Sequence, residues 1–470
     1  MGTWNLRHAS SRIRRKLNLK IFTLGFIAFV GLFLSLWRST IPSIYLPFGR
    51  LEDPEERSSS QRGMENFSPH RKAVGSTASW NGWIDHNQRA LRQLLVCLER
   101  DSHTCRRNQT SVILLASYHF IAQQEGHIGG EEIWAQSTVA ALDTLGYTYF
   151  FTSHWDGARI QQGLSRTIDY YRMFPDLVKA VIAESDQAFN CFDDPRCILN
   201  RDNPYGIPVW KILSFSFWAG PASPLGHKWT LSPEEYNREH SWVVPNTYLG
   251  YSVEPGCRNI SFLPHEQRKT PHSAFLIAKD AKYLHPDIHA WEPETYREAA
   301  KMTGVQFFMG ADGSLPNDFP IDVVENLDQM PQDWFYQMLS SVNVAIGVGR
   351  PWTSPTMYDA LCLGVPVVNP ILEWDTNDPS NRDKWVAQHA ALKDLDPPYV
   401  YNVFKNDMQS FIKAIQSALS NPIESFILER MRMRAVEDRL GRILETDWQY
   451  EAENLLEERM KKGETPLFTV

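Results

Sequence analysis

The sequence has no internal repeat with a period of 20 to 50 residues, and this absence excludes solenoid architectures. It also lacks a basic excess: 47 Lys and Arg residues stand against 55 Asp and Glu residues, for a formal net charge of −8. Without the six positive charges of residues 1–20, the remainder carries about −14. Because phosphate binding requires a basic face, this composition argues against nucleic acid as a partner.

The N-terminus has no acidic residue in its first twenty positions and carries six basic ones. The segment that follows, 21–37, is an uncharged run of 17 residues dominated by Phe, Leu, Ile and Val. This length is at the lower limit for crossing a bilayer. Residues 38–42 contain no small-residue cleavage site, so we expect an uncleaved anchor rather than a signal peptide. The basic flank then predicts a cytoplasmic tail at 1–20 and a lumenal remainder.

The sequence has only six cysteines, and four of them form closely spaced pairs: Cys97 with Cys105, and Cys191 with Cys197. In an oxidising lumen each pair could close a short disulfide loop, although six cysteines allow 15 pairings. We expect Cys362 to be a small buried hydrophobic residue, and Cys257 has no obvious partner. If the lumenal assignment holds, Asn66, Asn108 and Asn259 begin glycosylation sequons.

At 470 residues the chain is too long for one core and fits two domains with extensions. Residues 38–110 are expected to form a stem and a connecting helix, because their first part is rich in Ser, Pro, Arg and Glu and the segment 83–100 has leucines at helical spacing. The apolar runs 111–116 and 147–152 flank a helical stretch at 131–145, which indicates a parallel crossover. We therefore expect an α/β protein with a first lobe at 111–265 and a second at 272–440. A C-terminal helical tail follows at 441–470.

The segment 342–374 is predicted to form a strand, a Gly-rich turn, a helix and a second strand. Ser354 is expected to cap the helix with Pro355 at its first position, which leaves the amides of Thr356 and Met357 unpaired, as a phosphate site requires. Arg350 would add positive charge, and the Asp359 carboxylate could accept from two ribose hydroxyls. From spacing alone, an ordinary α/β crossover explains the segment equally well.

The same segment resembles the nucleotide-sugar site of the N-acetylglucosaminyltransferase V family, glycosyltransferase family 18. The matching residues are Gly349, Pro351, Ser354, Pro355, Asp359, Ala360, Gly364, Asn369 and Pro370. Residues 226–233 and 246–252 are also similar to that family. The resemblance covers roughly residues 111 to 430, in patches.

The resemblance implies a GT-B fold, in which two Rossmann-like parallel-sheet lobes face a cleft. It implies inverting transfer of N-acetylglucosamine from UDP-N-acetylglucosamine to the 6-hydroxyl of an α-mannose on an N-glycan. No metal or other cofactor is expected, and the protein would be a single-pass type II protein of the Golgi membrane. Rival hypotheses are a GT-B transferase with another nucleotide sugar and a catalytically silent carbohydrate-binding protein. The family has Glu where this chain has Asp359, and this difference, together with fewer cysteines and a short stem, leaves the acceptor open.

An inverting transfer needs a carboxylate that takes the proton of the acceptor hydroxyl. The family has a Gly-Glu at the start of the corresponding first-lobe helix, and counting back from Gly146 places Glu131 on that glutamate, with the adjacent Glu132 as the alternative. Either residue could instead be an acidic first-turn residue favoured by the helix dipole. The pair Asp193 and Asp194 could suggest a metal site, but a structural turn is the favoured interpretation because no other ligands follow at useful spacing.

Overall fold

The computed structural model describes residues 82–99, 105–127, 129–154, 160–236, 244–268, 272–464 and 468. The expected cytoplasmic tail, anchor and most of the stem lie outside these ranges, as does the sequon at Asn66. Within the described ranges no helix is both long and apolar enough to cross a membrane. All of the described residues belong to one compact unit.

The first lobe is built on a six-stranded sheet in which every pairing is parallel. Its order is β2-β1-β3-β4-β5-β6. The strands are β1 (Val112–Ala116), β2 (Thr148–Phe151), β3 (Val178–Glu184), β4 (Ile212–Phe215), β5 (Thr230–Ser232) and β6 (Thr247–Tyr248). All five side chains of β1 are buried, as its continuous apolar run predicted for a strand in the middle of a parallel sheet.

The helices of the first lobe are α2 (Gly82–Glu99), α3 (His119–Ala122), α4 (Gly130–Leu145), α5 (Ile160–Met173), α6 (Ser185–Asp193) and α7 (Glu254–Cys257). Short 3-10 turns are η1 (Val209–Lys211), η2 (His227–Trp229) and η4 (His265–Gln267). The predicted helix at 131–145 is confirmed as α4, which ends at the left-handed Gly146. Trp134 of α4 stacks on Phe215 of β4 with ring centroids 3.6 Å apart, so α4 anchors the core of this lobe.

The second lobe is built on a seven-stranded sheet in the order β12-β11-β10-β7-β8-β9, with β13 also paired to β11. The strands are β7 (Ser273–Ile277), β8 (Gln306–Met309), β9 (Val324–Asn326), β10 (Val344–Gly347), β11 (Val367–Glu373), β12 (Val386–Ala387) and β13 (Val400–Phe404). Only β12 runs antiparallel to its partner among these pairings. The helices are α8 (Pro293–Thr303), α9 (Gln332–Ser341), α10 (Thr356–Cys362) and α11 (Met408–Ser420), with the 3-10 turns η5 (Ala281–Leu284), η6 (Arg382–Lys384) and η7 (Ala390–Leu392).

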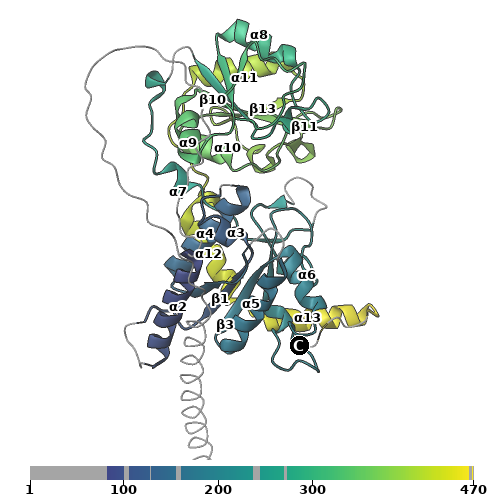
Figure 1. Cartoon of the computed structure of the whole chain (residues 1–470). Helices are drawn as coiled ribbons and strands as arrows, with labels where there is room; N and C mark the ends of the chain where they lie inside the picture. The colour runs from purple at the N-terminus through teal and green to yellow at the C-terminus, as the bar shows by residue number, and fades with distance from the viewer. Residues whose placement is uncertain are drawn as a thin grey trace, which may run out of the picture. The chain divides into compact units, whose positions relative to one another are not determined.

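The C-terminal segment returns to the first lobe. It contains η8 (Glu429–Met431), α12 (Met433–Glu445) and α13 (Trp448–Lys461). Helix α12 packs beside α4, and the Glu445 carboxylate accepts from Tyr147 Oη at 2.7 Å (Figure 1). Although α12 begins inside the sequence range expected for the second lobe, its contacts are therefore with the first.

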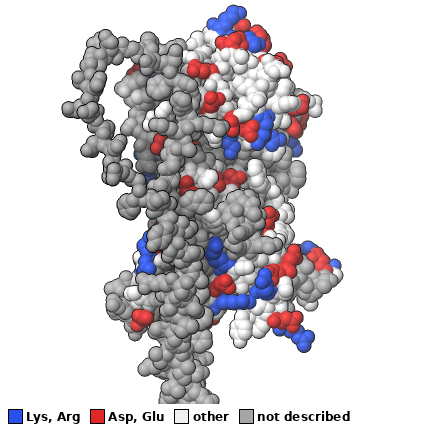
Figure 2. Space-filling view, viewed as in Figure 1, with Lys and Arg blue, Asp and Glu red and all other residues white. Residues whose placement is uncertain are grey.

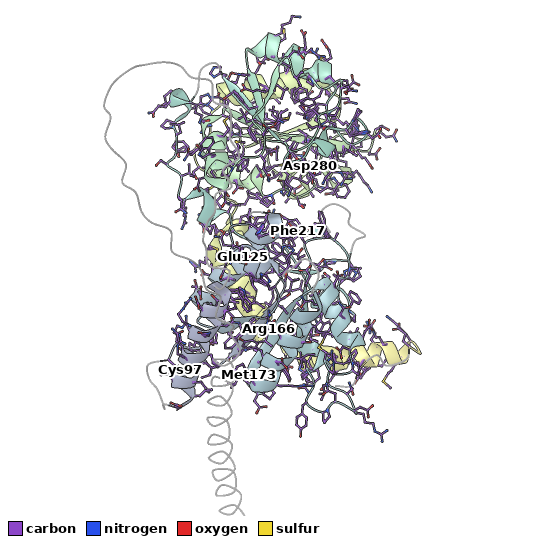
Figure 3. The ribbon with its side chains drawn as sticks, in the orientation of Figure 1. Cys97, Glu125, Arg166, Met173, Phe217 and Asp280 are labelled. Carbon is purple, nitrogen blue, oxygen red and sulfur yellow. A yellow bond between two sulfur atoms is a disulfide. The ribbon has the colours of Figure 1, made fainter. Side chains whose placement is uncertain are left out.

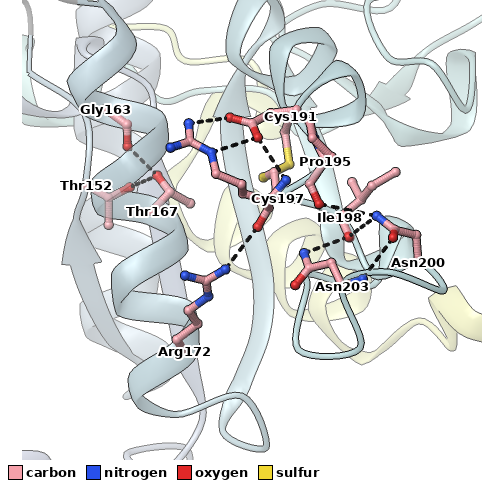
Figure 4. Close-up of a disulfide and its surroundings, with 12 residues drawn as sticks. Thr152, Gly163, Thr167, Arg172, Cys191, Pro195, Cys197, Ile198, Asn200 and Asn203 are labelled. Atoms are coloured by element: carbon pink, nitrogen blue, oxygen red, sulfur yellow. Dashed lines mark hydrogen bonds and ion pairs between the residues drawn. A yellow bond between two sulfur atoms is a disulfide. The ribbon is translucent and has the colours of Figure 1, made fainter.

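The two predicted short disulfides, Cys97–Cys105 and Cys191–Cys197, are both present. Figure 4 shows the second bridge among hydrogen bonds that close the same turn, including Asn203 Nδ2 donating to the Ile198 carbonyl at 3.0 Å. The Asp194 carboxylate accepts from Arg196, so this turn is structural, as the sequence favoured. The expectation for the remaining cysteines was wrong: Cys257 and Cys362 form a third bridge across 105 residues, which joins α7 to α10.

Candidate active site

A cavity of about 270 Å³ brings together most of the predicted site residues. Its wall comes from both lobes: from the first, the start of α4 and the loop after β4, where Phe217 is labelled in Figure 3; from the second, the end of β7, helix α9 and the turn before α10. Glu131, Ser354, Thr356 and Asp359 all line it. Three larger cavities, of about 490, 430 and 560 Å³, lie at residues 382–421, 86–149 and 280–318 and contain none of the predicted site residues.

The turn between β10 and α10 depends on Gly349. Its φ is 103°, a left-handed conformation that favours glycine, and a Cβ there would lie 2.7 Å from the Ile288 carbonyl oxygen. Gly349 N donates to Gln388 Oε1 at 2.8 Å. The described cavity wall does not include Gly349, so its role in this structure is to shape the turn.

Gln388 holds the same turn at two further points. Its Nε2 donates to the Pro351 carbonyl at 3.0 Å, and its own carbonyl accepts from Thr353 N at 3.2 Å. Thr353 needs such support because it is β-branched and has a φ of 54°. Gln388 follows the short strand β12 and has no sequence signal of its own, which is why sequence reasoning missed it.

The start of α10 differs from the prediction by one residue. Pro355, rather than Ser354, is the N-cap position, and its φ of −55° and ψ of −28° are already helical. No side chain caps the helix. The Met357 amide, expected to be unpaired, donates to the Ser354 carbonyl at 3.3 Å. The geometry thus leaves Thr356, not Met357, as the first-turn residue at the cavity.

Arg350 is not part of the described cavity wall. Its guanidinium carbon lies 3.6 Å from the centroid of the Trp352 ring, in a cation–π contact. The one Lys or Arg residue among the described lining residues is instead Lys279. It lies two residues after the end of β7. A polar residue at the carboxyl end of a parallel strand is a recognisable sequence signal for a site, and it was overlooked.

Asp359 lines the cavity but is 2% exposed. Tyr336 Oη of α9 donates to its Oδ1 at 3.2 Å. Burial raises the pKa of Asp359 to about 7, against the opposing effect of the Tyr336 hydrogen bond. Near neutral pH this side chain therefore exists in both protonation states.

The two adjacent glutamates of α4 have different surroundings. Glu131 lines the cavity, whereas Glu132 is absent from its described wall. Glu132 Oε2 accepts from Gly129 N at 2.7 Å, as in a capping box, and Oε1 lies 2.6 Å from His119 Nδ1. Glu131 therefore lines the cavity, whereas the carboxylate of Glu132 is bound to Gly129 and His119.

No group of three or more His, Cys, Asp or Glu side chains in the described part of the chain is placed to hold a metal ion.

Of the two described sequons, Asn259 is exposed, and Asn108 donates from Nδ2 to the Leu145 carbonyl at 2.9 Å.

No protein-family model matches this chain, and no curated protein matches it. The chain is similar to solved structures of sugar-nucleotide enzymes and glycosyltransferases. They include a glycosyltransferase involved in avilamycin A biosynthesis (12% identity, TM-score 0.42, covering 75% of this chain and 98% of that one). A sucrose-phosphate synthase from Thermosynechococcus elongatus has 11% identity, a TM-score of 0.39, and covers 75% and 98%. UDP-GlcNAc 2-epimerase from Methanocaldococcus jannaschii has 10% identity, a TM-score of 0.36, and covers 71% and 98%. Because these TM-scores are below 0.5, the function has to be argued from the residues of this chain.

Proposed function

We propose that this protein is a GT-B-type glycosyltransferase that binds a UDP-sugar in its second lobe. One observation carries the proposal: a single cavity is lined by a carboxylate from the first lobe, Glu131, and by the turn before α10 from the second. This arrangement suits a reaction between two substrates, since each lobe can hold one of them. The motif resemblance of residues 342–370 supports the same interpretation.

The donor would lie against the second lobe. A diphosphate needs positive charge and amide donors, and Lys279 and the first turn of α10 at Thr356 supply them at the cavity wall. Helix α10 has seven residues, so we assign more of the charge complementarity to Lys279 than to the helix dipole. Arg350 lies over the ring of Trp352, which itself lines the cavity. Asp359 is the acceptor proposed for the ribose hydroxyls.

The acceptor would approach from the first lobe. Glu131 takes the proton from the attacking hydroxyl while the new carbon–oxygen bond forms at the anomeric carbon and the bond to the diphosphate breaks. The electron pair of the broken bond leaves with UDP. Attack from the face opposite the leaving group inverts the anomeric centre. No metal takes part in the proposed steps.

The finer assignment comes from the resemblance to glycosyltransferase family 18. We propose N-acetylglucosamine as the transferred sugar and the 6-hydroxyl of an α-linked mannose on an N-glycan as the acceptor. We also propose a single-pass type II orientation in the Golgi membrane, with residues 38–470 in the lumen, from the basic residues before the apolar run 21–37.

The decisive experiment incubates the full chain, purified in detergent, with a panel of UDP- and GDP-sugars, with N-glycan acceptors, and with or without EDTA. Transfer from UDP-N-acetylglucosamine alone, unaffected by EDTA, is the expected result. Transfer from another donor would leave a GT-B transferase of different specificity. Glycan binding without donor hydrolysis or transfer would favour the silent carbohydrate-binding protein.

The orientation is tested separately in sealed microsomes. The C-terminal part should resist added protease, and glycosidase treatment should increase its mobility if Asn66, Asn108 or Asn259 carries a glycan. Complete digestion of the C-terminal part would exclude the lumenal orientation.

A further inference from the structure

His119 contacts Glu132, the residue after the candidate base Glu131, and lies outside the described cavity wall. It begins the short helix α3, three residues after the end of β1. Its Nδ1 is 2.6 Å from Glu132 Oε1 and its Nε2 is 4.0 Å from Glu184 Oε2, with the His119 and Glu132 side chains each 12% exposed. Ser117 Oγ donates to the same Glu184 oxygen at 2.6 Å. The imidazole is thus set between two carboxylates from different elements.

Glu132 also contacts the backbone just before Glu131. Its second oxygen accepts from Gly129 N at 2.7 Å. A Cβ at Gly129 would collide with the Glu132 carboxylate, and a Cβ at Gly130 would lie 2.6 Å from the Phe217 ring. The backbone immediately before Glu131 is therefore fixed on one side by Glu132 and on the other by Phe217.

The charges around His119 favour its protonated form. The groups that face it are Glu132 and Glu131 of α4 and Glu184 at the end of β3, while the neighbouring Tyr118 has its ring centroid 4.1 Å away. Asp186 of α6 acts on Glu184 and Tyr118. Burial acts to lower the pKa of His119, but the hydrogen bond that His119 donates to Glu132 and the charges of Glu184, Glu132 and Glu131 raise it above its ordinary value. Burial likewise acts to raise the pKa of Glu132, yet its His119 contact holds it below the usual range.

We propose that His119 is a positioning residue for Glu131: as an imidazolium it holds Glu132 against the Gly129 amide and so fixes the first turn of α4 with Glu131 directed at the cavity. This inference rests on the proposed function. It assigns His119 no contact with either substrate. It also gives each of the two adjacent glutamates a role: Glu131 would act as the base, and Glu132 would hold the backbone that positions it.

The proposal has a consequence for pH. A histidine with a raised pKa keeps its proton below that pKa and loses it as the pH rises through it. Above that pH the ion pair with Glu132 is lost, and the alignment of Glu131 weakens. Transfer should therefore decline on the alkaline side of its pH optimum, with the decline set by His119.

The test compares the full chain with His119→Phe, His119→Asn and Glu132→Gln. A matched control is His154→Asn, because His154 Nε2 also faces a carboxylate, Glu125 at 3.5 Å, in the same lobe. We expect His119→Phe to lower kcat at least tenfold with the KM for the donor within twofold of the parent, and UDP binding to be retained, which shows that the second lobe is folded. His119→Asn, which keeps a donor but cannot titrate, should lose the alkaline decline, as should Glu132→Gln. His154→Asn should keep the parent profile.

Two results would overturn the proposal: His119→Phe with parental kcat, or His119→Asn with the alkaline decline intact. Its failure can be separated from that of the proposed function by NMR titration of the histidine rings in isotope-labelled full chain. A His119 pKa that is raised in the parent and falls in Glu132→Gln supports the pairing even if no sugar is transferred. Equal values in the two proteins would overturn it whether or not the protein is a transferase.

Discussion

Asp359 is a carboxyl group that folding buries almost completely, with Tyr336 as its hydrogen-bond donor. Its pKa is about 7 in the folded protein and near 4 in an unfolded chain. Between these values the folded state binds more protons, so the free energy of unfolding should fall as the pH rises from about 4 and reach its full loss above about 7. The shift corresponds to a loss on the order of 4 kcal/mol. Urea unfolding at several pH values should show this decline in the parent and not in Asp359→Asn; parallel curves would refute the shifted pKa.

The same carboxyl group is the proposed ligand of the ribose hydroxyls. Removing a charged hydrogen-bond partner costs about 1.5 to 3 kcal/mol, or roughly tenfold to a hundredfold in affinity. We expect Asp359→Ala to weaken UDP binding by this factor in calorimetry. A ribose hydroxyl donates best to the ionised form, so parental binding should also strengthen as the pH rises through about 7. Unchanged affinity in Asp359→Ala would remove Asp359 from the donor site.

Glu131 and Glu132 can be separated by substitution. Glu131→Gln should retain UDP binding, which we propose for the other lobe, and lose at least about a hundredfold in transfer, since a general base contributes roughly 10²- to 10⁴-fold. The comparison uses initial rates at saturating donor. If Glu131→Gln transfers normally and Glu132→Gln does not, the base is Glu132. Normal transfer by both would exclude a carboxylate of α4 from the mechanism.

At the scale of elements, the third disulfide joins α7 to α10, the helix that follows the turn after β10. Constraining an unfolded chain across 105 residues should stabilise the fold by roughly 4 to 5 kcal/mol, against roughly 2 kcal/mol for the six-residue separation of Cys191–Cys197. We expect Cys257→Ala with Cys362→Ala to lower the melting temperature more than Cys191→Ala with Cys197→Ala. Calorimetry of both double variants checks this order, and a smaller effect from the long bridge would contradict it.

The elements that sequence predicted best were those with purely local signals. Val112–Ala116 is continuously apolar, and α4 has both a glycine start and the stop at Gly146, so strand and helix were recognisable. The short disulfides follow from spacing for the same reason. By contrast, the Cys257–Cys362 bridge and the three contacts of Gln388 with the turn between β10 and α10 exist only because the chain brings distant residues together. The helix cap at Ser354 was displaced by one residue because Pro355 already has helical dihedral angles, a choice that depends on the preceding turn.

On the face of the molecule drawn in Figure 2, the described Lys and Arg side chains lie among Asp and Glu side chains and form no separate basic patch. This mixture of charges agrees with the formal net charge of −8. Ion pairs instead connect segments that are distant in sequence. Lys179 of β3 reaches Glu445 of α12 at 2.8 Å, and Arg430 reaches Glu234 at 2.9 Å.

Because the ion pair of Glu234 and Arg430 is largely buried, its loss should lower the free energy of unfolding more than the loss of an exposed pair. Glu234, after β5, is 4% exposed at its side chain and Arg430 is 17% exposed, and Tyr358 of α10 donates to Glu234 Oε1 at 3.0 Å. These three residues therefore connect the first lobe, the C-terminal segment and α10 of the second lobe. Removing one partner of a buried pair leaves an uncompensated charge, so Glu234→Gln should cost about 3 kcal/mol of unfolding free energy.

The matched control is Lys179→Met, which breaks an ion pair between the same two parts of the chain in which Glu445 is 62% exposed. An exposed pair is worth at most about 1 kcal/mol, because solvent screens it. Urea unfolding of both variants at neutral pH measures the difference. Equal losses, or a loss below about 1 kcal/mol for Glu234→Gln, would mean that water compensates Arg430 and that the cluster does not hold the lobes together. A large loss in Glu234→Gln with weakened UDP binding would show that the stability of the junction also sets the position of α10.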